Sequence, residues 1–214
     1  MRKAVIALAA LTVLSAPAAS RAEEQDLNLK LGVGLGYSIP FGDASKGEKL
    51  SDVAAGEVPV ELELSYRFTH AISAGVYGGY GFGLVSSSSV EGVKASDVID
   101  SITTWRFGVQ GEYEFQKLGP AIPYAGLRVG YVTESVKQKN GGGTSSASGW
   151  EYLTVLAGAD FEVAKELAVG PFASFAVGQY TTRQAAGGSS ESIPSGDRTM
   201  HQWLTIGVRG AFGF

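Results

Sequence analysis

Ionisable side chains of both signs recur at even spacing within several segments of the chain, and this spacing limits the chemistry open to them. Glu61, Glu63 and Arg67 are an example, because residues an even number apart lie on the same face of a β-strand. The charges that share this pattern are Lys30, Glu61, Glu63, Arg67, Arg106, Glu112, Glu114, Arg128, Asp160, Glu162 and Arg209. Charges removed from water persist only when they are paired and hydrogen-bonded. We therefore predict that these side chains form a network of paired charges inside the fold, in the lumen if the strands close into a barrel, and that this network fixes the register of the strands. The alternative is a gated ion path through rearranging salt bridges.

Catalytic chemistry would need a nucleophile, a base and an orienting acid within hydrogen-bond reach. The chain has two histidines, His70 and His201, and the sequence close to His201 offers Ser189, Ser190, Ser192, Glu191 and Asp197. Serine-rich loops contain such combinations by chance, so we predict a non-enzymatic protein without catalytic residues, and a lipid-A-modifying enzyme is the weakest alternative. Because the two histidines fall at opposite ends of the predicted fold, we expect no metal site, and we expect no cofactor.

Eight segments in which apolar and polar residues alternate position these side chains. They cover residues 27–39, 58–68, 72–84, 105–115, 124–131, 152–163, 167–180 and 203–214. In the last segment Leu204, Ile206 and Val208 share one face, and Arg209 lies on the other. A period of two residues is that of a β-strand. The chain is therefore predicted to be all-β.

The connections between these segments alternate in length. Three are short, at residues 69–70, 116–121 and 164–166, and four are long and polar, at residues 41–57, 85–101, 135–149 and 181–200. Short periplasmic turns and longer extracellular loops are the rule for outer-membrane barrels. The pattern predicts an eight-stranded antiparallel up-and-down transmembrane β-barrel with four long extracellular loops.

The distribution of charge and glycine distinguishes this barrel from a soluble one. The mid-strand charges lie on the glycine-bearing face, and a lipid-facing Lys or Arg at the bilayer midplane would cost roughly 2–4 kcal/mol. Glu151 has the opposite parity but falls at a predicted extracellular rim. Glycines such as Gly79 and Gly81 weaken a strand that faces water, whereas inside a narrow barrel they make room for large side chains. We therefore predict apolar residues outside and charges inside.

Length and composition agree with an exported single domain. Residues 1–22 have a basic start, an apolar run and a small-x-small site, the layout of a cleaved signal peptide, and residues 23–214 form the predicted barrel domain. The chain has no cysteine, so barrel closure must stabilise the fold without disulfides. A net charge of -4 excludes the basic field that nucleic-acid binding requires.

Two further groups of residues could meet ligands at the extracellular end. Tyr152, Tyr180 and Trp203 are predicted to point inward there and to form an apolar mouth, although such aromatics more often only fill a barrel. The cations of the predicted outer loops are Lys46, Lys49, Lys94, Lys137, Lys139, Arg183 and Arg198. They could meet lipopolysaccharide phosphates or could simply be solvated.

The chain resembles the small outer-membrane barrel superfamily that includes OmpA, OmpX and OmpW in its leader, its eight alternating segments, its four long connections and the sequences PYAGLRVGY at 123–131 and GVRGAFGF at 207–214. The aromatic Phe214 that ends the last strand resembles the signal read by the bacterial assembly machinery. The resemblance implies the outer membrane of a Gram-negative bacterium, lipid and lipopolysaccharide as surroundings, and the barrel-assembly machinery and periplasmic chaperones as transient partners. Members include structural and adhesive barrels, carriers of small apolar compounds and a few lipid-A enzymes.

These observations lead to two functional hypotheses. The first is a monomeric, integral outer-membrane barrel with a side-chain-filled lumen and a structural or surface-display role. The second is a narrow transporter of small hydrophobic molecules, which would enter near Tyr152, Tyr180 and Trp203. They would leave laterally through the barrel wall, because the charged periplasmic half of the lumen is closed.

Overall fold

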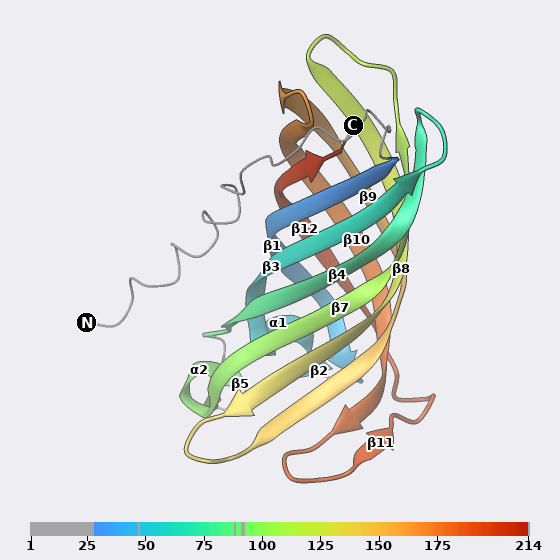
Figure 1. Ribbon diagram of the computed structural model, residues 1–214. Coiled ribbons are helices and arrows are strands. Elements are labelled where there is room, and N and C mark those ends of the chain that lie inside the picture. The colour runs from blue at the N-terminus through green and yellow to red at the C-terminus, as the bar shows by residue number, and fades with distance from the viewer. Residues whose placement is uncertain (1–27, 47, 88, 91–92, 214) are drawn as a thin grey trace, which may run out of the picture.

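The computed structural model describes residues 28–46, 48–87, 89–90 and 93–213, which form one closed β-barrel (Figure 1). Its eight strands are β1 (Leu29–Ser45), β3 (Ala54–Arg67), β4 (Ile72–Val85), β7 (Ile99–Glu114), β8 (Ala121–Gln138), β9 (Thr144–Ala164), β10 (Leu167–Gln184) and β12 (Met200–Phe212). Each pairs antiparallel with the next in sequence, and β1 pairs with β12 from Leu31 opposite Phe212 to Gly42 opposite His201. The predicted signal peptide and Phe214 lie outside the described residues.

The two ends of the barrel differ as the sequence predicts. Both the start of β1 and the end of β12 lie at one end, together with the connections 68–71, 115–120 and 165–166, and we call it the turn end. The opposite end, the loop end, carries the short elements β2 (Glu48–Lys49), α1 (Leu50–Val53), β5 (Ser89–Val90), β6 (Val93–Lys94), α2 (Ala95–Val98) and β11 (Ser190–Ser192). It lies in the lower part of Figure 1.

The strands run further toward the loop end than the sequence pattern predicts. β8 and β9 continue to pair up to Lys137 opposite Thr144, so only residues 139–143 lie outside strands where a loop over 135–149 was predicted. This stretch is polar on both faces, and the alternation that marks a half-buried strand is therefore missing. The strands form there because pairing satisfies the backbone donors and acceptors.

The apolar face points outward and the charged face inward, as predicted. Leu62 and Phe107 are 58% and 60% exposed on the outer wall, whereas Lys30 and Arg128 are each 4% exposed in the lumen. This arrangement is the reverse of a soluble barrel and fits lipid outside. No helix of the described residues is long and apolar enough to cross a membrane.

A β-bulge in β9 shifts the phase of alternation. Arg128 of β8 lies opposite Thr154, but Gly130 lies opposite Glu151, so β9 has one extra residue in this interval. The bulge turns Glu151 into the lumen, where it is 3% exposed, and leaves Tyr152 47% exposed on the outer wall. The predictions that Tyr152 points inward and that Glu151 has the outer parity are therefore wrong. A strict period of two cannot anticipate an inserted residue.

Close approach of strands makes one lumen glycine sensitive to substitution. A Cβ added at Gly170 would overlap the carbonyl oxygen of Ala159 on the neighbouring strand, whereas a Cβ added at Gly210 meets no atom within 4 Å. We expect Gly170→Ala to lower the free energy of unfolding by about 1–3 kcal/mol, the usual cost of overpacking. Gly210→Ala should change it by less than about 0.5 kcal/mol. Urea titration of both variants refolded in lipid vesicles would measure this, and equal midpoints would contradict the prediction.

Candidate functional site

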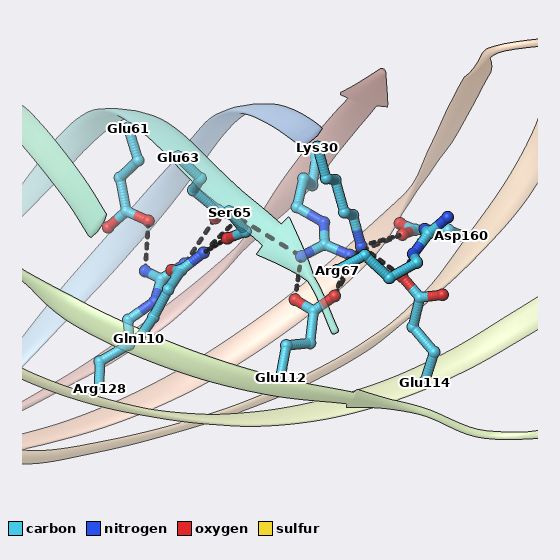
Figure 2. A network of polar contacts seen from close by, with 11 residues as sticks. Lys30, Glu61, Glu63, Ser65, Arg67, Gln110, Glu112, Glu114, Arg128 and Asp160 are labelled. Carbon is cyan, nitrogen blue, oxygen red and sulfur yellow. Dashed lines mark hydrogen bonds and ion pairs between the residues drawn. The ribbon is translucent and has the colours of Figure 1, made fainter. Parts of the chain in front are cut away.

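A cluster of ion pairs fills the lumen near the turn end. Arg209 donates from Nη1 to Oε2 of Glu112 at 2.5 Å and from Nη2 to Oδ2 of Asp160 at 2.6 Å. Lys30 Nζ lies 2.6 Å from Glu112 Oε1 and 2.7 Å from Glu114 Oε1 (Figure 2). The side chains of Arg209 and Asp160 are each 2% exposed. Four strands thus contribute charges to one buried cluster.

A second cluster lies in the middle of the barrel and is joined to the first. Arg128 donates from Nη1 to Glu61 Oε2 at 2.8 Å and from Nη2 to Glu63 Oε1 at 2.5 Å (Figure 2). Gln110 Nε2 donates to Glu63 Oε2 at 3.3 Å. The same oxygen lies 3.5 Å from Arg209 Nη1, so Glu63 connects the two clusters.

A third cluster lies toward the loop end and contains acids that the sequence analysis did not include. Arg106 Nη1 lies 2.8 Å from Glu57 Oε1, and its Nε lies 3.5 Å from Glu151 Oε1. Tyr77 donates its hydroxyl to Glu151 Oε2 at 3.5 Å. Glu57 was missed because β3 begins before the predicted segment 58–68, and Glu151 was missed because of the bulge.

One member of the predicted network lies at its margin, and another lies outside it. Arg67 Nη2 is 3.5 Å from Glu114 Oε1, and its side chain is 18% exposed. Glu162 is not in the network: its side chain is 47% exposed and pairs with Lys117 of the 115–120 turn. β8 begins at Ala121, opposite Phe161, so Glu162 extends past the wall that would enclose it. The prediction that Glu162 belongs to the lumen network is wrong for this reason.

Glycines provide the space that the large lumen side chains occupy. A Cβ on Gly130 would overlap the hydroxyl of Tyr77, and a Cβ on Gly158 would overlap the hydroxyl of Tyr124. The Tyr124 ring also lies 3.6 Å from the guanidinium carbon of Arg209. The cavity between the second and third clusters has a volume of about 20 Å³, room for about one water molecule.

An apolar layer covers the charges on the side of the loop end. Leu50 of α1 reaches into the mouth, where it is 1% exposed, and Trp203 is 4% exposed beneath it. The layer consists of Leu50, Ala54, Ile99, Ile102, Ala176 and Trp203. The first loop therefore folds into the barrel and closes it, an inward contact that sequence alternation does not indicate.

His201 lies inside the barrel at the loop end and not on its surface. It is fully buried and stacks on the Tyr180 ring with centroids 4.2 Å apart. Neither ring nitrogen has a hydrogen-bond partner among the described residues. Ser190, Glu191 and Ser192 lie exposed in β11, so these predicted partners do not hydrogen-bond to the imidazole. No group of His, Asp and Glu that could hold a metal ion occurs in the described ranges.

The three aromatics of the predicted mouth do not line one pocket. Tyr152 faces outward, Tyr180 packs with Val132 and Ile193, and Trp203 belongs to the apolar layer. Tyr180 and Trp203 do point inward. The bulge in β9 is again the reason for the error at Tyr152.

Several loop cations are held by local partners. Lys137 lies 3.3 Å from Asp100, and Lys139 donates to the carbonyl oxygen of Ser96 at 2.6 Å. Arg183 pairs with Glu191 at 2.8 Å, and Arg198 donates to the carbonyl oxygen of Ile193. These contacts favour solvated surface charges over a built phosphate site.

Comparison with known proteins decides the family. A model of the outer membrane protein beta-barrel domain matches residues 6–189. The chain belongs to this family. No match is found among curated protein sequences.

Solved structures share the fold. Neisserial surface protein A has 15% sequence identity and a TM-score of 0.52, over 87% of this chain and 97% of that one. OprG from Pseudomonas aeruginosa has 12% identity and a TM-score of 0.52, over 88% and 98%. The outer membrane protein AlkL has 11% identity and a TM-score of 0.55, over 92% and 94%. At these identities the likeness establishes the barrel fold and not a specific role.

Family membership places the barrel in the outer membrane. The lipid bilayer therefore contacts the apolar outer wall, and the lipopolysaccharide leaflet surrounds its outer part. In such barrels the short turns are periplasmic and the longer loops extracellular, so the turn end faces the periplasm and the loop end faces outward.

Proposed function

We propose that this protein is a non-enzymatic, non-conducting outer-membrane barrel whose role is structural and whose wall displays the extracellular loops. The observation that supports it is the filled lumen. Three ionic clusters, of which the first two are joined through Glu63, and one apolar layer follow one another from the turn end to the loop end.

The energetics of these clusters favour a lumen that is closed to ions. Each buried carboxylate of the first and second clusters is held by one or two cations. An ion that entered the lumen would have to break these pairs while losing its own hydration. Breaking one buried pair costs about 3–5 kcal/mol, because the remaining charge stays uncompensated. Because Glu63 links two clusters, disrupting one of them disturbs the next.

Conductance in a planar bilayer tests the proposal. We expect protein that has refolded, as judged by heat-dependent migration on a gel, to give no sustained current steps. Vesicles taken through the same refolding without protein serve as the control. Repeated current steps of uniform size from folded protein would show that the side chains filling the lumen can move aside, and would refute the closed barrel.

The proposed partners and route follow from family and sequence. We propose export through the signal peptide, insertion by the barrel-assembly machinery after delivery by periplasmic chaperones, and a monomer in the membrane. Absence of lipid-A chemistry is part of the proposal, and an altered lipid A mass spectrum in an overexpressing strain would contradict it.

Transport of small hydrophobic molecules is the second candidate. A pocket of about 460 Å³ at the loop end favours it, since Tyr180 lies in its lining. Two features oppose it: the Trp203 layer lies below, and the ladder between β7 and β8 continues through Gly108 opposite Gly130 without a lateral gap. If apolar solutes enter a deletion strain as fast as the wild type, the carrier hypothesis fails.

A further inference from the structure

The pocket at the loop end combines apolar walls with a single buried acid. It lies between α1, β8, β9, β10 and β11, and its lining includes Leu50, Val53, Val136, Ala147, Tyr180 and Glu134. Leu50 and Tyr180 are 1% and 3% exposed and lie at its base, whereas Arg183, Gln184 and Glu191 are exposed at its rim. The pocket is therefore accessible from outside the cell and closed toward the lumen.

Glu134 differs from the other lumen acids because it has no cation. It is 6% exposed, and one oxygen accepts a hydrogen bond from the Tyr180 hydroxyl at 2.8 Å. No cation pairs with it within the described part of the chain. The guanidinium of Arg106 is engaged by Glu57 and Glu151 instead. A carboxylate in this position lacks the counter-charge that buried acids normally have.

The rim of the pocket does not provide that charge. Arg183 is paired with Glu191 at 2.8 Å, and both side chains are 60% exposed. Among the described residues, the lumen near the loop end has an excess of acid, since Glu57, Glu151 and Glu134 lie there with a single cation, Arg106. The field at Glu134 is therefore one that attracts cations.

We propose that this pocket binds a small organic ammonium ion, with the charged group against Glu134 and the apolar part against Leu50, Val53, Val136 and Ala147. A metal ion does not fit the pocket as well, because Na⁺, K⁺ or Ca²⁺ needs several oxygen ligands, and the described residues contain no group of acids and histidines that could hold one. A neutral apolar molecule would leave the acid unpaired. An alkylammonium both pairs the acid and covers the apolar surface.

The test compares three probes of equal length on protein in lipid nanodiscs. n-Pentylammonium, 1-pentanol and pentanoate would be titrated by calorimetry, with empty nanodiscs as the blank. We expect saturable binding of pentylammonium, binding of pentanol at least tenfold weaker, and no binding of pentanoate. Pentanol binding as tightly as pentylammonium would overturn the proposal and indicate an apolar site only. Absence of saturable pentylammonium binding would also overturn it.

Two variants locate the charge that matters. Glu134→Gln keeps the size of the side chain and an oxygen that can accept from Tyr180, and should weaken pentylammonium binding at least tenfold while leaving pentanol unchanged. Glu162→Gln removes the same charge from an exposed side chain at the turn end, away from the pocket, and should change affinity less than twofold. Heat-dependent migration confirms that each variant is folded. If Glu134→Gln binds as the wild type does, or Glu162→Gln loses as much affinity, the assignment to Glu134 is wrong.

Discussion

Arg209→Met is expected to lower the free energy of unfolding by about 3–5 kcal/mol, the cost of leaving buried charges uncompensated. Arg209 contacts Glu112 and Asp160, and it is 1% exposed. Without it the closest cation to Asp160 is Lys30, at 3.8 Å. Urea unfolding in lipid vesicles, followed by tryptophan fluorescence, measures the loss.

The exposed pair Lys117–Glu162 provides the matched control for Arg209. Its side chains are 46% and 47% exposed, so water solvates each charge when the other is removed. Lys117→Met should therefore lower the free energy of unfolding by no more than about 1 kcal/mol. If Arg209→Met is as mild as this control, the lumen network does not stabilise the barrel.

Trp203→Ala is expected to lower the free energy of unfolding by about 3–5 kcal/mol, the range for removing a large buried aromatic side chain. Trp203 packs in the apolar layer below Leu50, and its ring lies 5.7 Å from the guanidinium carbon of Arg106. The cavity left behind opens only toward the ionic clusters, so the variant should remain silent in a planar bilayer.

The control for Trp203 is Trp105, which is 59% exposed on the outer wall. Trp105→Ala removes the same side chain without opening the lumen, and its cost should be less than half as large. Unfolding in vesicles and conductance would be measured on both variants. Current steps from Trp203→Ala would show that the apolar layer, and not the three ionic clusters, closes the barrel. Faster or slower uptake of apolar solutes in this variant alone would favour the carrier hypothesis.

Sequence reasoning succeeded where a strand keeps its period through the membrane. In β1, β8 and β12 the lipid excludes charge from one face, so parity alone places Lys30, Arg128 and Arg209 inside. It failed at Tyr152 and Glu151, where one inserted residue reverses the parity. It also failed at Glu162, because the end of a neighbouring strand decides whether that side chain is enclosed.

The loop end shows the same limit for contacts distant in sequence. The burial of His201 and Leu50 and the isolation of Glu134 depend on how α1 and β11 fold against the strand ends. These segments are polar or irregular, and water can solvate them in many different conformations. Their sequence therefore contains no periodic signal that names a partner.

The sequence by itself determined the class of the protein, the number of strands and the side of the wall on which charges lie, because the two-residue period of a strand and the exclusion of charge by lipid are local constraints. The tertiary structure decided which acid meets which base, where the bulge occurs and which loop closes the mouth. Those outcomes depend on barrel closure, since β1 meets β12 only after the whole chain has come round, and the lumen partners are then set by register and not by neighbours in sequence.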